Sequence, residues 1–147
     1  MTGHRSAGRG RDEAGSVAVE IALLAPALVL VLGLLVAGGR LWFARTTVVE
    51  AAQTSARAAS LARSPSDATS AGGEAGRQSM TTAGLRCASS SVRVSTAAFA
   101  VPVGTPATVT SDVACSVPFG DVLLPGVPGS IALSGHGSAA LDTYRAR

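Results

Sequence analysis

One long uncharged segment constrains the fold of this chain more than any other feature. From Ile21 to Gly39, 19 consecutive residues carry no charge, and most of them are Leu, Val or Ala. As an α-helix this segment is roughly 28 Å long, which matches the hydrocarbon core of a lipid bilayer. No other segment is apolar enough to surround such a helix in a soluble core. The sequence therefore predicts a transmembrane helix over residues 16–39.

Two further features describe this predicted span. Pro26 removes one backbone hydrogen bond and predicts a kink near the start of the helix, which membrane helices tolerate. Three arginines precede the apolar segment and two follow it closely (Arg5, Arg9 and Arg11; Arg40 and Arg45). Because basic residues are retained on the cytoplasmic side, this bias favours a cytoplasmic N-terminus and an extracytoplasmic C-terminal part.

The composition supports a lipid environment and disfavours two other classes of protein. Hydrophobic residues make up 47% of the chain and charged residues only 14%, against an average of about 25%. High hydrophobicity argues against an intrinsically disordered protein. All 12 basic residues are arginines, and they are scattered along the chain instead of forming one basic surface. We therefore expect no nucleic-acid partner.

The sequence predicts four segments besides the span. Residues 1–15 form a cytoplasmic leader without regular structure, and residues 87–147 a small β-rich extracytoplasmic domain. Residues 64–86 form a linker, in which a short helix could form around residues 74–83. Residues 40–63 extend the helix beyond the membrane, with Trp42 at the interface, and Ser64-Pro65 ends it. One face of this extension carries mostly small apolar side chains, at Leu41, Ala44, Val48, Ala52, Ser55, Ala59 and Ala62.

Beyond Cys87 the hydrophobic period changes from that of a helix to two, which is typical of half-buried strands. The first strand contains Val92 and Val94, and a turn at Gly104-Thr105-Pro106 leads to the second, whose buried face holds Val109, Val113, Cys115 and Val117. A third, short strand starts at Ile131 and weakens at Gly135-His136-Gly137. We predict an α+β fold: a long N-terminal helix, transmembrane in its first half and amphipathic in its second, packed on a small antiparallel sheet.

Few residues in the sequence suggest chemistry. His4 and His136 have no carboxylate or cysteine close to them in sequence, no serine lies in a G-x-S-x-G motif, and the acidic residues are dispersed. We therefore predict no catalytic, cofactor-binding or metal-binding residue, and no enzyme. Cys87 and Cys115 lack the spacing of a metal site or a redox motif. They would form a disulfide in an exported domain, and remain free thiols in an internal one.

The residues at the start of the span carry the most specific signal. Gly15-Ser16-Val17-Ala18-Val19-Glu20 joins the polar leader directly to the apolar segment. An acidic residue at the mouth of a membrane helix is unfavourable unless it is paired or reaches the interface. Further along the chain stand Ala25-Pro26, Gly39-Arg40 and the segment AAQTSARAA of residues 51–59. Over residues 11–63 these motifs resemble TadE-like proteins, the minor pilins or pseudopilins of tight-adherence (type IVb, Flp) pilus systems.

The resemblance implies a pilin-like fold and a role in pilus structure or assembly. A prepilin peptidase would cut after Gly15, leaving Ser16 as the N-terminus, and Glu20 would pair with the terminal ammonium of a neighbouring subunit. The implied partners are other pilin and pseudopilin subunits, the peptidase, the assembly platform and the lipid bilayer. Export would also make a Cys87–Cys115 disulfide the expected state. The chain departs from the family pattern at Ser55, where glycine is usual, and at Ile21, where an aromatic residue is common.

Two alternatives remain open at this point. The apolar segment could be a signal peptide, cut in Ala37-Gly38-Gly39 before Arg40 to release a secreted β-rich binding domain. The chain could also be an uncleaved single-span protein of the cell envelope. The first residue of the mature protein separates the three interpretations: Ser16 for the pilin-like protein, Arg40 for the secreted domain, and Met1 or Thr2 for the uncleaved one.

Overall fold

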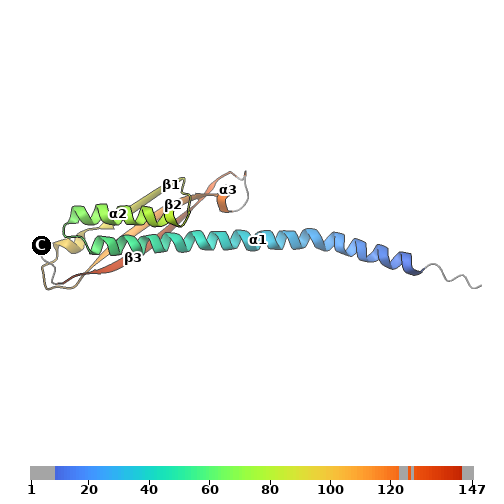
Figure 1. Ribbon diagram of the computed structural model, residues 1–147, viewed down its shortest axis with the longest axis horizontal. Coiled ribbons are helices and arrows are strands. Elements are labelled where there is room, and N and C mark those ends of the chain that lie inside the picture. The colour runs from blue at the N-terminus through green and yellow to red at the C-terminus, as the bar shows by residue number, and fades with distance from the viewer. Residues whose placement is uncertain (1–8, 123–125, 127, 144–147) are drawn as a thin grey trace, which may run out of the picture. The chain divides into compact units, whose positions relative to one another are not determined.

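The computed structural model describes residues 9–122, 126 and 128–143 of the chain (Figure 1). It divides into two compact units, Met1–Gly38 and Gly39–Arg147. Helix α1 (Arg9–Ser60) contributes its first part to the first unit and its second part to the second. Side chains of α1 are described from Val19 onward.

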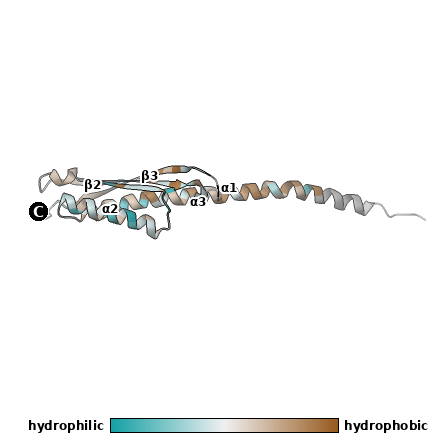
Figure 2. Ribbon diagram, turned by 90° about the horizontal axis from the view of Figure 1, so that it is seen from above, coloured by the Kyte–Doolittle hydropathy of each residue, from teal (hydrophilic) through white to brown (hydrophobic). Residues whose placement is uncertain are grey.

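The described part of the first unit is a helix, and from Val19 onward its apolar side chains are exposed. Leu23 is 72% exposed and Leu34 is 73% exposed, and none of the most apolar 18-residue window is buried. The helix is long and apolar enough to cross a membrane, as predicted, and Figure 2 shows this run of hydrophobic residues along α1. Pro26 lies inside the helix without ending it.

The predicted unstructured leader is wrong for residues 9–15, because α1 begins at Arg9; residues 1–8 of the leader lie outside the described part. Once a helix has nucleated in the apolar segment, each added residue extends it at little further cost.

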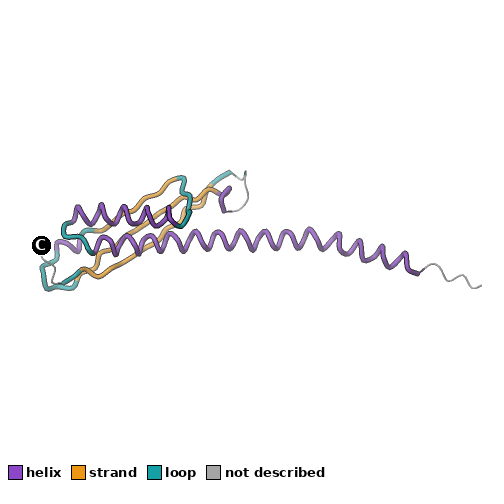
Figure 3. Tube along the Cα trace, viewed as in Figure 1, coloured by secondary structure: helices purple, strands orange, loops and turns teal. Residues whose placement is uncertain are grey.

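The second unit packs two helices on one face of a three-stranded antiparallel sheet with strand order β1-β2-β3. Figure 2 shows the sheet and the helices as two layers, and Figure 3 shows the strands beside them. After α1 the elements are α2 (Pro65–Thr82), β1 (Ser89–Ser95), the 3-10 helix η1 (Ala97–Ala100), β2 (Ala107–Pro118), α3 (Phe119–Val122) and β3 (Ser130–Leu141). The predicted α+β fold class is therefore confirmed.

The second part of α1 covers the sheet with its face of small residues. Its buried residues are Ala44, Thr47, Val48, Ala51, Ala52, Ser55, Ala56 and Ala59. On β2 the buried residues alternate with exposed or half-buried ones, as predicted, from Val109 to Val117. Among the described residues, the only buried aromatic side chain is that of Phe99, which is 7% exposed; it belongs to η1 and packs in a cluster with Val109 of β2 and Leu141 of β3.

Residues 65–82 of the predicted linker 64–86 form α2. The short helix expected around residues 74–83 is therefore the second half of a longer one, and the remainder of the linker is wrong for residues 65–73. Ser64 caps this helix: its hydroxyl accepts a hydrogen bond from the Asp67 amide N–H at 3.1 Å, and Pro65 occupies the first turn. Ser64-Pro65 therefore starts α2, and α1 ends earlier, at Ser60. Gly72 and Gly76 are buried contact positions in α2 and do not break it.

The third strand is also longer than predicted. Strand β3 runs for 12 residues and continues through Gly135 and Gly137. A Cβ atom at Gly135 would lie 2.6 Å from the Val48 carbonyl oxygen, and one at Gly137 would collide with the Ala52 carbonyl. The two glycines therefore let the backbone of β3 lie directly against the backbone of α1.

Candidate functional site

The residues of the predicted processing and assembly site all lie in α1. Gly15, Ser16 and Glu20 follow one another on this helix, and the five-residue step from Gly15 to Glu20 corresponds to about 7.5 Å along its axis. The Glu20 side chain is exposed between Val19 and Ile21, which are themselves about 60% exposed (62% and 60%). None of the ion pairs formed by the described residues involves Glu20. Its carboxylate thus lies exposed at the start of an apolar surface.

The two cysteines form a disulfide in the second unit, with their Cα atoms 5.5 Å apart. Cys115 lies on β2 and is 2% exposed in the core, whereas Cys87 lies in the connection between α2 and β1. Next to it the Ala88 amide donates a hydrogen bond to the Ser116 carbonyl at 2.8 Å. The disulfide therefore attaches the start of the sheet's edge strand to its central strand.

One family of known proteins matches the segment that contains the predicted processing and assembly residues. Residues 15–57 match the family described as TadE-like protein. This segment is TadE-like. The match begins at Gly15, includes the whole apolar part of α1 and continues into its buried part; residues 58–147 lie outside it. No curated protein and no solved structure matches the chain. The TadE-like segment indicates a pilin-like component associated with a tight-adherence pilus.

Within the TadE-like segment, Ser55 makes a contact that sequence reasoning missed. Its hydroxyl accepts a hydrogen bond from the Ser111 hydroxyl at 2.8 Å, and both residues are fully buried. On α2, Cβ atoms at Gly72 and Gly76 would lie about 3 Å from Ser55 (3.0 Å from its carbonyl oxygen and 3.3 Å from its Cβ). The G-x-x-x-G spacing of these two glycines is visible in the sequence and is typical of helices that pack closely against a neighbour. The Ser55–Ser111 pair had none, because its residues are 56 positions apart.

A histidine–aspartate pair lies on the opposite face of the sheet from the helices. His136 on β3 faces Asp112 on β2, with 2.8 Å between His136 Nδ1 and Asp112 Oδ1. Sequence reasoning gave His136 no partner because Asp112 lies on the neighbouring strand. Both side chains are more than 60% exposed (62% and 69%), so the pair contributes little to stability. Among the described residues, no group of three or more His, Cys, Asp and Glu could hold a metal ion.

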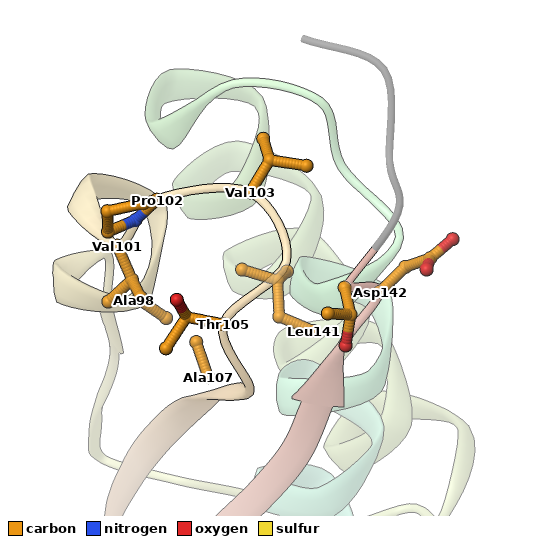
Figure 4. A pocket seen from close by; sticks show the side chains of 9 residues that line it. Ala98, Val101, Pro102, Val103, Thr105, Ala107, Leu141 and Asp142 are labelled. Atoms are coloured by element: carbon orange, nitrogen blue, oxygen red, sulfur yellow. The ribbon is translucent and has the colours of Figure 1, made fainter.

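A small hollow lies at the end of the sheet where β3 ends. It is formed between the segment that follows η1 and the last residues of β3. Figure 4 shows Ala98, Thr105 and Leu141 among its lining residues. Its volume of about 10 Å³ admits about one water molecule. The hollow is too small for a cofactor.

Proposed function

We propose that this chain is a minor pilin or pseudopilin-like structural or assembly component of a tight-adherence type IV pilus. The observation that carries this proposal is the position of the TadE-like match, which begins at Gly15 and includes the helix that could cross a membrane. Its partners would be other pilin and pseudopilin subunits, the pilus assembly platform in the membrane and the prepilin peptidase.

In this proposal the chain crosses the cell membrane once. Residues 1–15 are the cytoplasmic leader, residues 16–39 span the bilayer, and the second unit lies outside the cytoplasm. Two observations support this orientation. Arginines are more numerous before the span than directly after it. The Cys87–Cys115 disulfide also suits an oxidising compartment, where such bonds form and persist.

Processing after Gly15 would convert the precursor into a subunit ready for assembly. A peptidase binds extended chain, so the helix around Gly15 must unwind locally before cleavage. Glycine favours this step, since it destabilises a helix by about 1 kcal/mol relative to alanine. Cleavage would leave a Ser16 ammonium and a Glu20 carboxylate on every subunit. Each charge is unfavourable in lipid by itself, and pairing between neighbours would remove that penalty.

The first residue of the mature protein tests the proposal. We expect intact-mass analysis and N-terminal sequencing to find Ser16 in cells that contain the peptidase. Gly15→Leu should block cleavage, because a bulky side chain does not fit at the cleavage position. The variant should then keep residues 1–15 and have a correspondingly larger mass. Gly33→Leu is the matched control, since a Cβ at Gly33 has no atom within 4 Å, and it should be processed normally. Retention of the leader in the unmodified protein would contradict processing, and a mature chain starting at Arg40 would identify a secreted domain instead.

A further inference from the structure

One end of the second unit brings together three segments that are far apart in sequence. On β3, Gly137 lies against Ala52 of α1, and Gly135 lies against Val48. A step of two residues along β3 therefore matches a step of four residues, about one turn, along α1. Continuing this spacing places Ile131 beside Leu41, and both residues pack on the same core cluster. We call this the Leu41 end, and it comprises residues 40–45, 84–87 and 118–121.

Segments 84–87 and 118–121 are placed at this end by their connections to β2. The 84–87 connection is held to β2 by the Cys87–Cys115 disulfide and by the hydrogen bond from Ala88 to Ser116. Helix α3 follows Pro118 directly. Figure 1 shows α3 and the end of α2 at the same end of the sheet. Leu85 and Cys87 also pack on the same core cluster as Leu41, so the segments that carry Arg86 and Asp121 lie at the same end of the sheet as residues 40–45.

The Leu41 end is both aromatic and positively charged. Trp42 is 71% exposed and Phe43 is 55% exposed. Three exposed arginines and one acidic residue lie here: Arg40, Arg45, Arg86 and Asp121. Between residues 39 and 143 the remainder of the unit carries four arginines and five acidic residues. Positive charge is thus concentrated where α1 enters the domain.

We propose that the Leu41 end rests on the headgroups of an anionic phospholipid leaflet. The proposal depends on the single-span topology proposed above. The apolar segment ends at Gly39, and the first buried residue of α1 beyond it is Ala44, at 3% exposure. Those five residues cover about 7.5 Å, which is close to the thickness of one headgroup layer. No length of helix is then left to hold the domain clear of the lipid.

The side chains at this end suit that environment. Tryptophan is enriched at membrane–water interfaces, where its ring is apolar and its N–H is solvated. Each arginine near an anionic surface multiplies the ratio of docked to undocked domain by about five. Arg40, Arg45 and Arg86 together therefore raise this ratio by roughly a hundredfold. High salt weakens the effect, because the Debye length falls to about 3 Å at 1 M.

The test uses the full chain in lipid nanodiscs, with a nitroxide attached through Gly120→Cys on α3. A Cβ at Gly120 has no atom within 4 Å, so the label fits. The measurement is the nitroxide collision rate with oxygen, which concentrates in lipid, relative to a water-soluble nickel chelate. We expect this ratio to rise when phosphatidylglycerol is added to phosphatidylcholine, and to fall again in 1 M salt. Quenching of Trp42, the only tryptophan, by brominated lipid reports whether the span has inserted.

Arg86→Gln should lower the docked-to-undocked ratio about fivefold in anionic nanodiscs. Arg93→Gln is the matched control, because Arg93 is exposed on the far face of the sheet, and it should leave the ratio unchanged. Equal collision ratios in both lipids, with Trp42 inserted, would overturn the docking surface and leave the single-span function intact. Spin–spin broadening that is independent of lipid charge would mean that a second copy covers this end, and would also overturn it. Failure of Trp42 to insert would contradict the topology itself.

Discussion

The two parts of α1 belong to one helix but have opposite surroundings. In the first part, large apolar residues such as Leu23 and Leu34 are more than 70% exposed (72% and 73%). In the second part, the residues that face the sheet are small, and Val48 and Ala52 are fully buried. Large apolar side chains suit lipid, which adapts to their shape. Small ones allow protein backbones to approach, and in this fold the carbonyl of Ala52 lies directly over Gly137.

This difference shows that hydrophobicity alone does not say what covers a helix. The first part is apolar on all sides and the second only on one face, yet only the second has neighbours in the structure that match its apolar surface. A face of alanines and serines gains little from apolar area and instead gains from many close van der Waals contacts. The second part should therefore be sensitive to the addition of a single methyl group, whereas the first should be sensitive mainly to charge.

The largest expected effect concerns the charge at the start of the apolar part. Glu20→Gln keeps the size and hydrogen-bonding capacity of the side chain but removes the charge that would pair with a neighbour's Ser16 ammonium. We expect cleavage after Gly15 to continue and pilus assembly to be lost or strongly reduced. Crosslinking to the major pilin, in cells where processing has been verified, measures this. Normal assembly of the processed variant would leave Glu20 as a residue that is merely solvated at the interface.

The disulfide should affect the second unit and leave the first unchanged. Replacing both Cys87 and Cys115 with alanine should lower the free energy of unfolding of this unit by about 3–4 kcal/mol, because a closed loop of about 29 residues loses its restraint in the unfolded chain. Urea denaturation in detergent, followed by near-UV circular dichroism, measures the change. Alkylation of both thiols in native, unreduced protein would show that the bond is absent in the cell.

The addition of one methyl group should have different effects on stability beside the two parts of α1. Gly137→Ala places a Cβ against the Ala52 carbonyl of the buried part, where neither backbone can yield, and should destabilise the fold by about 2–3 kcal/mol. Gly33→Ala adds the same group where no atom lies within 4 Å, and should leave the second unit unchanged. Thermal unfolding of both variants in the same detergent measures the difference. Equal melting temperatures would contradict the close contact between α1 and β3.

The smallest expected effect concerns the buried hydroxyl pair. Ser55→Ala or Ser111→Ala leaves one hydroxyl without its partner and should cost about 1–2 kcal/mol. The double variant should cost less than the sum of the two single ones, since no unpaired group then remains. A double-mutant cycle from denaturation curves gives the coupling energy. Strict additivity would indicate that the two hydroxyls do not interact.

Some structural features were predictable because their signals are contiguous in sequence. The apolar helix follows from 19 uncharged residues, and the TadE-like segment from motifs between Gly15 and Arg57. The strands around Val94 and Val113 follow from alternation, because successive side chains on a strand point to opposite faces. The candidate residues Gly15, Ser16 and Glu20 were found in the same way, and their roles stay predictions.

The sequence by itself determined where this chain is apolar, where its helix has a face of small residues and where it alternates. The tertiary structure decided the conformation of the glycine-rich segments, which became helix α2 around Gly72 and strand β3 around Gly137. It also decided the pairings Ser55–Ser111 and Asp112–His136. The physical reason is that glycine has no side chain and a weak local preference, so its conformation depends on the surface packed against it.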